Sequence, residues 1–571
     1  MFLITKKNLL QIIYSLLFLL ILCRSFSAKA QTNYIQTGLK DYDFLDRLEI
    51  KTRSQNLYYS AIKPYPRRQT ALQLEMTDSL LQSNSNYANL TEIDKYNLQS
   101  ELMNNSDWTK PRDYYNSKKP ILNALYKTKT NLLEVNNKDF FLAVNPVIYF
   151  TGGKEQNNDK VLFQNSRGLN ARGMIGKKVG FNLYVTDNQE RDPNYVNDWI
   201  KTYDAVPGAG FYKPVNLYTK GIVDYFDARG SVSWSVTKFI DMQFGYDKNS
   251  IGAGYRSLFL SDFSSAATFF KINTRIWKFD YQNLYFELYP QYNNSGNKLA
   301  PRKYARMNYL SMNATKWLNV GLFEGISFGR QDHFDFSYLN PVMFLRPAES
   351  NAGSADNAMV GFDAKANLGG KVQLYSQFLL DELKVKEFIK GTGWWANKNG
   401  LQLGLKYVDA FGLKNVDLQL EMNQVRPYTY SHFDSVANYT HYNQPLAHPL
   451  GANFREFIAI IKAQPMKKLY LRGTAIHYIK GLDSAGVNFG GNVFESYNTR
   501  PRQYGFKIGD GDKATCTMVQ LVASYELAQN LFIDLTGLIR NYKIASVADT
   551  QKTTAITLSL RWNLARRDFL F

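Results

Sequence analysis

Two polar, aromatic segments of the sequence carry side chains suited to holding a sugar. The first runs from Gly329 to Asn351, and the second runs from Tyr442 to Phe454. Both combine rigid prolines with aromatic rings and with side chains that donate or accept hydrogen bonds. A sugar ring is bound by a flat aromatic face on one side and by polar groups at its hydroxyls. The candidate binding residues are Tyr338, Asn340, Phe344, Arg346, Glu349, Tyr442, Asn443 and Gln444.

Arg346 is the one cation among these candidates. Its guanidinium fits a carboxylate through two parallel hydrogen bonds, which favours an acidic sugar such as a uronate. The alternative is that both segments are loops that fill the inside of a larger structure, with Arg346 and Glu349 neutralising each other. The residue types leave both interpretations open.

Side chains for catalysis or metal binding form no recognisable pattern. The chain has five histidines, and none of them lies in an H-E-x-x-H motif. His441 and His448 share one segment, and His333 follows Asp332, but a chain of this length contains such pairs by chance. We therefore expect no catalytic residue, no metal site and no cofactor, in a protein that is not an enzyme.

The N-terminus has the layout of a secretory signal peptide. The basic pair Lys6-Lys7 precedes an apolar run at residues 12–22, and Ala28-Lys29-Ala30 forms a small-residue cleavage site. The apolar run is shorter than the roughly 20 residues that a membrane-spanning helix needs. We expect residues 1–30 to be removed on export, which leaves Cys516 as the one cysteine and excludes an intrachain disulfide.

The composition favours a membrane β-barrel. Aromatic residues make up 15% of the chain, although the mean hydropathy is −0.35. Barrel strands alternate lipid-facing and lumen-facing residues, so the average hydropathy cancels. The net charge of +19 favours acidic partners such as anionic polysaccharide or lipid phosphates over nucleic acid, which an exported protein does not meet. A basic, solvated loop surface is the alternative reading of the same charge.

The residues after about Asp139 alternate with a period of two. In the last segment, Ile556, Leu558, Leu560, Trp562 and Leu564 alternate with Thr557, Ser559, Arg561 and Asn563. An arginine facing lipid near the membrane midplane costs about 2–4 kcal/mol, so the polar set is expected to face the lumen. The same alternation recurs at residues 372–380, 401–408 and 416–423.

Short turns and long loops alternate along this region. Tight connections are expected at residues 368–371, 410–413 and 464–467, and long loops at residues 187–216, 330–356, 426–453 and 480–512. The pattern predicts an all-β transmembrane barrel of about 18 antiparallel strands over residues 138–571. The terminal Phe571 resembles the C-terminal aromatic that outer-membrane assembly machinery reads.

Residues 31–137 have a helical, polar pattern instead. We expect a short helix near residues 41–50, and a helix over residues 70–81 that places Leu72, Met76 and Leu80 on one face. A third helix opens at Thr91, where Asp94 completes a variant of the capping box. We interpret this region as a small helical periplasmic unit that lies at or in the barrel mouth.

Motifs in the two polar segments resemble those of a known family. Tyr338-Leu339-Asn340-Pro341, followed by Phe344, Arg346, Glu349 and residues 353–358, resembles the capsule-assembly Wzi-like outer-membrane family, and residues 443–451 are similar to a second signature of it. The resemblance covers nearly the whole mature chain. It implies a barrel with a periplasmic helical bundle and a lectin-like role in attaching capsular polysaccharide. The chain also resembles a RemB-like branch of this family from gliding bacteria.

These features predict a non-catalytic barrel of the bacterial outer membrane, exported through a cleaved signal peptide, that binds or organises capsular or exo-polysaccharide. The alternative is a scaffold in a gliding-motility or secretion apparatus. A diffusion pore is a third hypothesis, and it requires an open lumen. The expected partners are outer-membrane lipid, an acidic surface polysaccharide and, for the scaffold, gliding or secretion proteins; no nucleic acid is expected.

Overall fold

The structure is a computed structural model of the whole chain. It describes residues 33–55, 60–122, 124–176, 178–210, 212–213, 220–290, 301–330, 333–342, 345–351, 353 and 356–571, with the side chains of Arg346, Ala348 and Asn351 left out. The predicted signal peptide, residues 1–30, lies outside the described residues.

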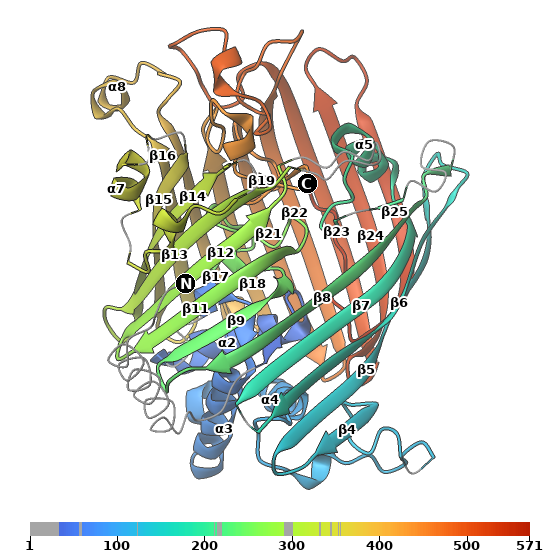
Figure 1. Cartoon of the computed structure of the whole chain (residues 1–571). Helices are drawn as coiled ribbons and strands as arrows, with labels where there is room; N and C mark the ends of the chain where they lie inside the picture. The colour runs from blue at the N-terminus through green and yellow to red at the C-terminus, as the bar shows by residue number, and fades with distance from the viewer. Residues whose placement is uncertain are drawn as a thin grey trace, which may run out of the picture.

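Antiparallel strands close into an 18-strand barrel (Figure 1). Each strand pairs with the next along the chain, and the last strand, β25, closes the barrel by pairing with β5. A short strand, β4 (Leu133–Asn136), extends the edge beside the start of β5. The barrel strands are β5 (Phe140–Glu155), β6 (Val161–Ile175), β7 (Val179–Arg191), β8 (Val223–Ser235), β9 (Ile240–Asp247), β11 (Ala267–Ile276), β12 (Phe279–Leu288), β13 (Lys303–Asn313), β14 (Leu318–Phe328), β15 (Asn357–Leu368), β16 (Val372–Glu382), β17 (Lys398–Tyr407), β18 (Val416–Val425), β21 (Phe454–Met466), β22 (Leu469–Leu482), β23 (Asp512–Ala528), β24 (Leu531–Ile544) and β25 (Gln551–Trp562).

The predicted alternation between the two faces of the strands is confirmed. Ile556 and Leu558 of β25 are each 58% exposed on the outside of the barrel. The polar residues that alternate with the apolar ones along β25 face the lumen. There Arg561 binds the carboxylate of Asp534 at 2.8 Å. The outside of this strand is therefore apolar and suited to lipid, and its arginine is paired inside the barrel.

The two ends of the barrel differ in the length of their connections. Short turns such as those at residues 369–371 and 467–468 lie at one end, and long connections such as residues 329–356, 426–453 and 483–511 lie at the other. Exposed aromatic rings mark the short-turn end, including Trp277 and Phe411, which is typical of a membrane–water interface. The predicted tight turns and long loops are confirmed.

Three helices of the N-terminal region lie at the short-turn end (Figure 1). They are α2 (Lys40–Thr52), α3 (Arg67–Ser83) and α4 (Glu92–Asn104), and we call them the helical plug. Further helices are α5 (Asn194–Tyr203), α7 (Arg346–Asn351) and α8 (Val385–Ile389), and short strand pairs join β1 (Tyr34–Ile35) with β3 (Tyr65–Pro66), β2 (Ile62–Lys63) with β10 (Ser250–Ile251), and β19 (Thr440–His441) with β20 (Gln444–Pro445). None of the helices in the described part of the chain is long and apolar enough to cross a membrane.

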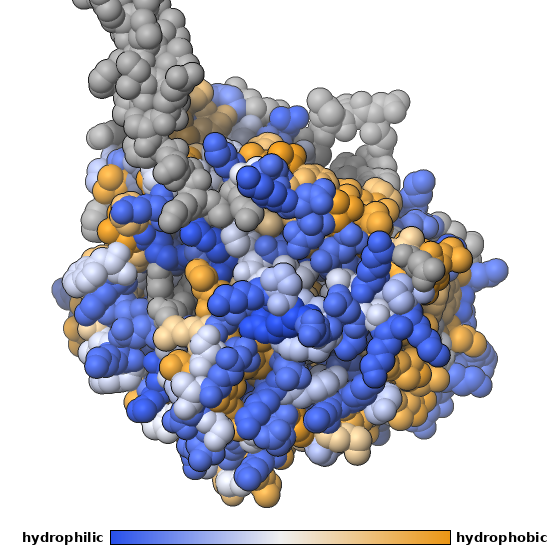
Figure 2. Space-filling view, turned by 90° about the horizontal axis from the view of Figure 1, so that it is seen from below, coloured by the Kyte–Doolittle hydropathy of each residue, from blue (hydrophilic) through white to orange (hydrophobic). Residues whose placement is uncertain are grey.

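Ion pairs hold the helical plug inside the short-turn end. Arg47 of α2 binds Asp94 of α4 at 2.6 Å and also reaches Asp409 and Asp417 of the barrel at 2.6 Å and 2.5 Å. Lys365 of β15 binds Glu49 of α2 at 2.8 Å. Seen from below, this end of the molecule is mostly hydrophilic at its centre (Figure 2). The plug therefore occupies the end of the lumen through charge pairing with the wall.

The three helices lie where the sequence predicts them, but the buried face of α3 differs from the predicted one. Thr91 and Asp94 form the expected capping box at the start of α4, with Asp94 N donating to Thr91 Oγ1 at 3.1 Å. In α3, however, Leu72 and Met76 are 61% and 47% exposed, and the face that includes Leu74 is buried instead. The predicted apolar face was wrong because α3 turns its other side, with Ala71, Leu74 and Thr77, toward the core of the helical plug.

The C-terminal residues 563–571 do not continue the last strand, contrary to the alternation predicted through Leu564. The last strand ends at Trp562, because Asn563 takes a left-handed conformation with φ of 53° and turns the chain. Leu564 packs inside the barrel beside Val147 and Tyr149 instead of facing outward. The chain then runs back through the lumen, so that Phe571 does not terminate a strand (Figure 1). We call residues 563–571 the C-terminal tail.

The lumen is filled by inward-folded segments. The connection between β9 and β11 enters the barrel, where Phe259 stacks on Phe323 of the wall at 4.7 Å. Tyr430 and Tyr439, from the connection before β21, donate hydrogen bonds to Leu258 O and Phe259 O at 2.8 Å and 2.7 Å. These segments, the C-terminal tail and α5 form a large apolar cluster inside the barrel.

Candidate functional site

The first predicted segment folds against the outside of the barrel. Tyr338 is fully buried there, and its hydroxyl donates to Asp356. Asn340 is exposed; its side chain accepts from Val342 N at 3.1 Å. Glu349 is buried on α7, and its backbone N–H donates to Leu345 O at 3.0 Å. Tyr338 and Glu349 thus support the loop's own structure.

Two further candidates of this segment are not described by the structure. Phe344 and the side chain of Arg346 lie outside the described residues. Pairing of Arg346 with a uronate and its pairing with Glu349 therefore both stay predictions.

The second predicted segment lies inside the barrel, near the long-loop end. Tyr442 stacks on Tyr289 with ring centres 5.0 Å apart, and its backbone N–H donates to Tyr289 O at 3.0 Å. Gln444 is fully buried; it accepts from Gly208 N at 2.8 Å and donates to Ala209 O at 2.9 Å. Gln444 thereby ties the β19–β20 hairpin to the chain that follows α5.

The structure does not bring the two predicted segments together, because the barrel wall stands between them. Asn443 is the predicted residue that borders a cavity at the long-loop end. This cavity has a volume of about 490 Å³, and we call it the mouth cavity. It is lined by Thr202, Tyr203, Asp204, Asn443, Lys480, Leu482, Asp483, Gly491, Asn492 and Phe494.

Aromatic rings form one side of the mouth cavity. Tyr203, the last residue of α5, has its ring centre 5.8 Å from that of Phe494. Behind it, Trp199 packs on Tyr203 at 4.7 Å. The helix ends here because Asp204 takes a left-handed conformation, with φ of 49°. The position of Tyr203 is therefore fixed by a helix end and by an aromatic layer beneath it.

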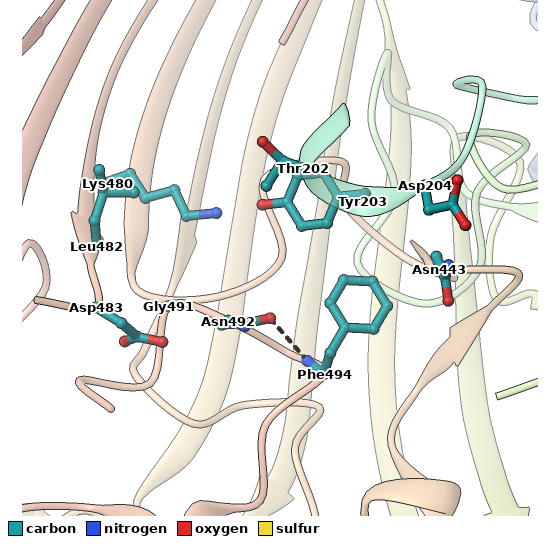
Figure 3. A pocket seen from close by; sticks show the side chains of 10 residues that line it. All are labelled: Thr202, Tyr203, Asp204, Asn443, Lys480, Leu482, Asp483, Gly491, Asn492 and Phe494. Atoms are coloured by element: carbon teal, nitrogen blue, oxygen red, sulfur yellow. Dashed lines mark hydrogen bonds between the residues drawn. The ribbon is translucent and has the colours of Figure 1, made fainter. Parts of the chain in front are cut away.

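Polar groups form the other sides of the mouth cavity, as the close view shows (Figure 3). Asn492 accepts from Phe494 N at 3.1 Å, and this turn holds both residues in place. The Lys480 ammonium donates to Leu450 O at 2.7 Å and points into the cavity, which leaves it two further N–H donors. The cavity can therefore offer hydroxyl and amide partners beside aromatic faces.

Charges around the mouth cavity are mixed. Lys480 is its one cation, and Asp204 and Asp483 are its two carboxylates. Burial raises the pKa of Asp483 above its ordinary value. The hydroxyl of Tyr212 donates to Asp204 at 2.5 Å, so that carboxylate already has a partner. The basic excess of the chain is not concentrated in this cavity.

Three histidines are held by the loops around the lumen. The His441 ring accepts from Tyr289 N at 3.1 Å and faces Ala266 O at 3.0 Å. Burial lowers the pKa of His441 to about 4, so the ring is neutral at pH 7. His448 bonds the carboxylate of Glu456 at 2.7 Å, and His432 accepts from Asp434 N at 3.3 Å. These rings organise loops and do not border the mouth cavity.

In the part of the chain that the structure describes, no group of three or more His, Cys, Asp or Glu side chains is arranged to hold a metal ion.

Sequence reasoning missed most residues of the mouth cavity. Tyr203 ends α5, whereas Lys480 on β22 and Phe494 in the connection after it lie more than 250 residues further along the chain, so no local pattern links them. The only local signal was the series of aromatic residues on one side of α5, Tyr195, Trp199 and Tyr203.

Comparisons with known proteins agree with the fold. No protein-family model and no curated protein sequence matches the chain. Among solved structures, Wzi of Escherichia coli, an outer membrane protein involved in group 1 capsule assembly and described as a carbohydrate-binding β-barrel, has a TM-score of 0.54 at 13% sequence identity. The match covers 94% of this chain and 100% of Wzi.

Other solved barrels match a smaller part of the chain. OprD of Pseudomonas aeruginosa has a TM-score of 0.41 at 12% identity and covers 74% of this chain and 94% of its own. OccAB2 of Acinetobacter baumannii has a TM-score of 0.41 at 9% identity, with 75% and 99% covered. At such identities the likeness concerns the fold alone. The resemblance predicted from the sequence motifs is confirmed at that level: this chain has the fold of the Wzi outer-membrane barrel.

Proposed function

We propose that this protein is a non-catalytic barrel of the bacterial outer membrane that binds cell-surface polysaccharide at the mouth cavity. The observation that carries the proposal is a cavity with aromatic and polar walls at the long-loop end of a barrel whose lumen is filled. The same fold in Wzi belongs to a protein described as carbohydrate-binding. A filled lumen argues against free diffusion and for a surface role.

The orientation of the barrel supports this proposal. Barrels of this class have short turns on the periplasmic side and long loops outside the cell. The mouth cavity would then face the surface polysaccharide, and the helical plug would face the periplasm. In this proposal residues 1–30 are a cleaved signal peptide, residues 31–137 are the helical periplasmic region and residues 138–571 are the outer-membrane barrel.

The size and chemistry of the mouth cavity fit one or two sugar units of a chain. Its volume of about 490 Å³ lies within the range of small-molecule sites. Tyr203 and Phe494 would stack against a sugar face, and Asn443 and Asn492 would bond hydroxyls. Lys480 is the group that would recognise a carboxylate, which fits an acidic polysaccharide.

A binding assay with the purified barrel tests this function. Surface polysaccharide extracted from the source cells is passed over immobilised protein in detergent. We expect retention by the native protein, and loss of retention by a Tyr203→Ala, Phe494→Ala double variant. Phe411→Ala, which removes an exposed ring at the opposite end of the barrel, is the matched control. Equal retention by the double variant would show that the mouth cavity is not the site.

A scaffold in a gliding or secretion apparatus is the second candidate function. It is favoured by the exposed apolar side chains of Leu72 and Met76 on α3, a helix that projects from the short-turn end (Figure 1). An exposed apolar face of this kind is typical of a protein contact. Affinity purification from membranes in mild detergent distinguishes the functions, since a scaffold would retain protein partners. Loss of those partners on Leu72→Ser, Met76→Ser substitution would support the scaffold.

A further inference from the structure

The outward face of three strands, β12 to β14, carries polar side chains near the long-loop end. Phe323 of β14 points into the lumen, where it stacks on Phe259. Its neighbour Glu324 must therefore point outward, because side chains alternate across a strand. Asn308 of β13 stands opposite Glu324 in the register and donates to its carboxylate at 3.3 Å. Asn283 of β12 continues the row by donating to Asn308 at 2.8 Å.

This polar row lies at the level of the apolar band. Glu324 is in register with Val360 of β15, which is 50% exposed on the outside. One row further from the long-loop end, Leu322 and Phe362 are in register and are 47% and 45% exposed. Acyl chains that cover these apolar side chains would also reach the polar row if nothing shielded it.

The connection between β14 and β15 supplies the shield. We call its described residues 333–342 and 345–351 the cover segment. Leu345 N donates to the Glu324 carboxylate at 2.6 Å. Pro341 O accepts from Tyr281 at 2.7 Å and from Asn283 at 3.2 Å. The cover segment thus gives the outward polar groups the hydrogen bonds that lipid cannot give.

Arg306 is also enclosed on this outward side. Its side chain is fully buried, lies 3.9 Å from the ring centre of Tyr285 and donates to Asn340 O at 3.3 Å. The same interface has an apolar part, in which Tyr338 and Leu345 of the cover segment pack against the wall. The outward wall residues in this cluster are Tyr304, Ile326 and Phe328.

The opposite side of the cover segment is exposed and mainly apolar, and the exposed polar side chains of Ser337 and Asn340 bond within the segment. Phe336, Leu339 and Val342 are 80%, 46% and 60% exposed. On the wall beside them, Tyr281 donates to Pro341 O and lies in the same cross-strand row as Leu322 and Phe362. A segment that turns its hydrogen bonds toward the barrel and exposes apolar side chains away from it has the pattern of an element immersed in lipid.

We propose that the cover segment is an interaction surface for the acyl chains of outer-leaflet lipid, with Phe336, Leu339 and Val342 in contact with them. Its occupant follows from its contact with the lipid-facing wall, since Pro341 of the cover segment bonds Tyr281, which shares a cross-strand row with Leu322 and Phe362. Residues that the sequence motifs associate with sugar binding, such as Asn340, then lie in the membrane and not at the mouth.

Site-directed spin labelling tests this proposal in the intact protein. Cysteines are placed singly at 336, 339 and 342 in a Cys516→Ala background, since Cys516 is a buried free thiol. The barrel is reconstituted in vesicles of outer-membrane lipid. Oxygen, which concentrates in lipid, and a water-soluble nickel complex compete to relax each label.

Two matched positions calibrate the measurement. A label at Leu322, on the lipid-facing wall, reports lipid, and a label at Phe433, which is 44% exposed in the long connection before β21, reports water. We expect oxygen to dominate at 336, 339 and 342 as it does at 322. Dominance of the nickel complex at these positions would overturn the proposal. Low access to both reagents in native outer-membrane fragments would also overturn it, because it would mean that a protein covers the segment.

Discussion

The ring of Phe571, the last residue of the chain, packs against Trp199 of α5 with ring centres 5.6 Å apart. Trp199 in turn supports Tyr203 in the wall of the mouth cavity. The C-terminal tail is anchored on the way by Arg567, which binds Glu190 at 2.8 Å, and by Phe569 O, which accepts from Tyr195 at 2.5 Å. A segment that begins at the short-turn end thus supports the site at the opposite end.

Removal of the C-terminal tail should open the lumen. Deletion of residues 565–571 takes away Phe569 and Phe571, so α5 loses the hydrogen bond from Tyr195 and the ring contact of Trp199 that tie it to the tail. We expect the native protein to be silent in planar bilayers and the deletion variant to conduct ions. The conservative variant Phe571→Leu, which keeps an apolar side chain at the same place, should stay silent. A folded deletion variant that does not conduct would show that other segments close the lumen alone.

Loss of Arg47 should weaken the attachment of the helical plug to the wall. The Arg47 side chain is 8% exposed and binds three carboxylates, those of Asp94, Asp409 and Asp417. Arg47→Met removes the ion pair of Asp417 and leaves Asp94 and Asp409 with Lys51 alone. Removing one partner of a buried pair costs up to about 3–5 kcal/mol. Thermal unfolding followed by circular dichroism should show a lower midpoint for the variant.

The matched control for Arg47 is an exposed pair on the same plug. Lys95 binds Glu92 at 2.7 Å on the surface of α4, and both are exposed or partly exposed. Lys95→Met should leave the unfolding midpoint nearly unchanged, because an exposed ion pair contributes little to stability. Equal effects of the two substitutions would contradict the role of Arg47 as the anchor of the plug.

Acid should loosen the hairpin that carries Asn443. The pKa of His441 is lowered from 6.5 to about 4 by burial, helped by nearby Lys303. A group whose folded pKa is depressed stabilises the fold above its unfolded pKa, and this stability is lost as the pH falls. We therefore expect the unfolding midpoint to drop as the pH falls from 6.5 toward 4.

His441→Gln should flatten that pH dependence, because glutamine does not titrate. Part of the pH dependence should remain in this variant, because burial also lowers the pKa of His432 to about 4. His333→Gln, at an exposed position, is the control and should follow the native curve. An unchanged slope in His441→Gln would assign the acid sensitivity to other groups.

The barrel was predictable because every strand meets the same constraint on its two faces. One face meets lipid and the other meets the lumen, so Ile556 and Leu558 alternate with Ser559 and Arg561 whatever the neighbouring strands are. The capping box at Thr91 was equally local. Phe571, by contrast, was misread because a terminal aromatic looks the same on a strand and in a returning tail.

The direction of the long connections was not predictable from local pattern. Tyr338 and Gln444 sit in similar polar, aromatic segments, yet one lies outside the wall and the other inside it. One signal was present in β14, where the alternation reverses: Leu322 is apolar and outward, but two residues later Glu324 is polar and outward. A polar outward residue at that level requires a cover, and only the tertiary fold shows which segment provides it.

The most direct test of the proposed function is calorimetric titration of the detergent-solubilised barrel with oligosaccharides cut from the source cell's surface polysaccharide. We predict saturable binding at one site, with at least about tenfold weaker affinity in Tyr203→Ala, which corresponds to about 1.4 kcal/mol. Lys480→Met should lower the affinity for acidic oligosaccharides more than the affinity for neutral ones. The same affinity for the native protein and Tyr203→Ala, or no saturable binding by the native protein, would contradict polysaccharide binding at the mouth cavity.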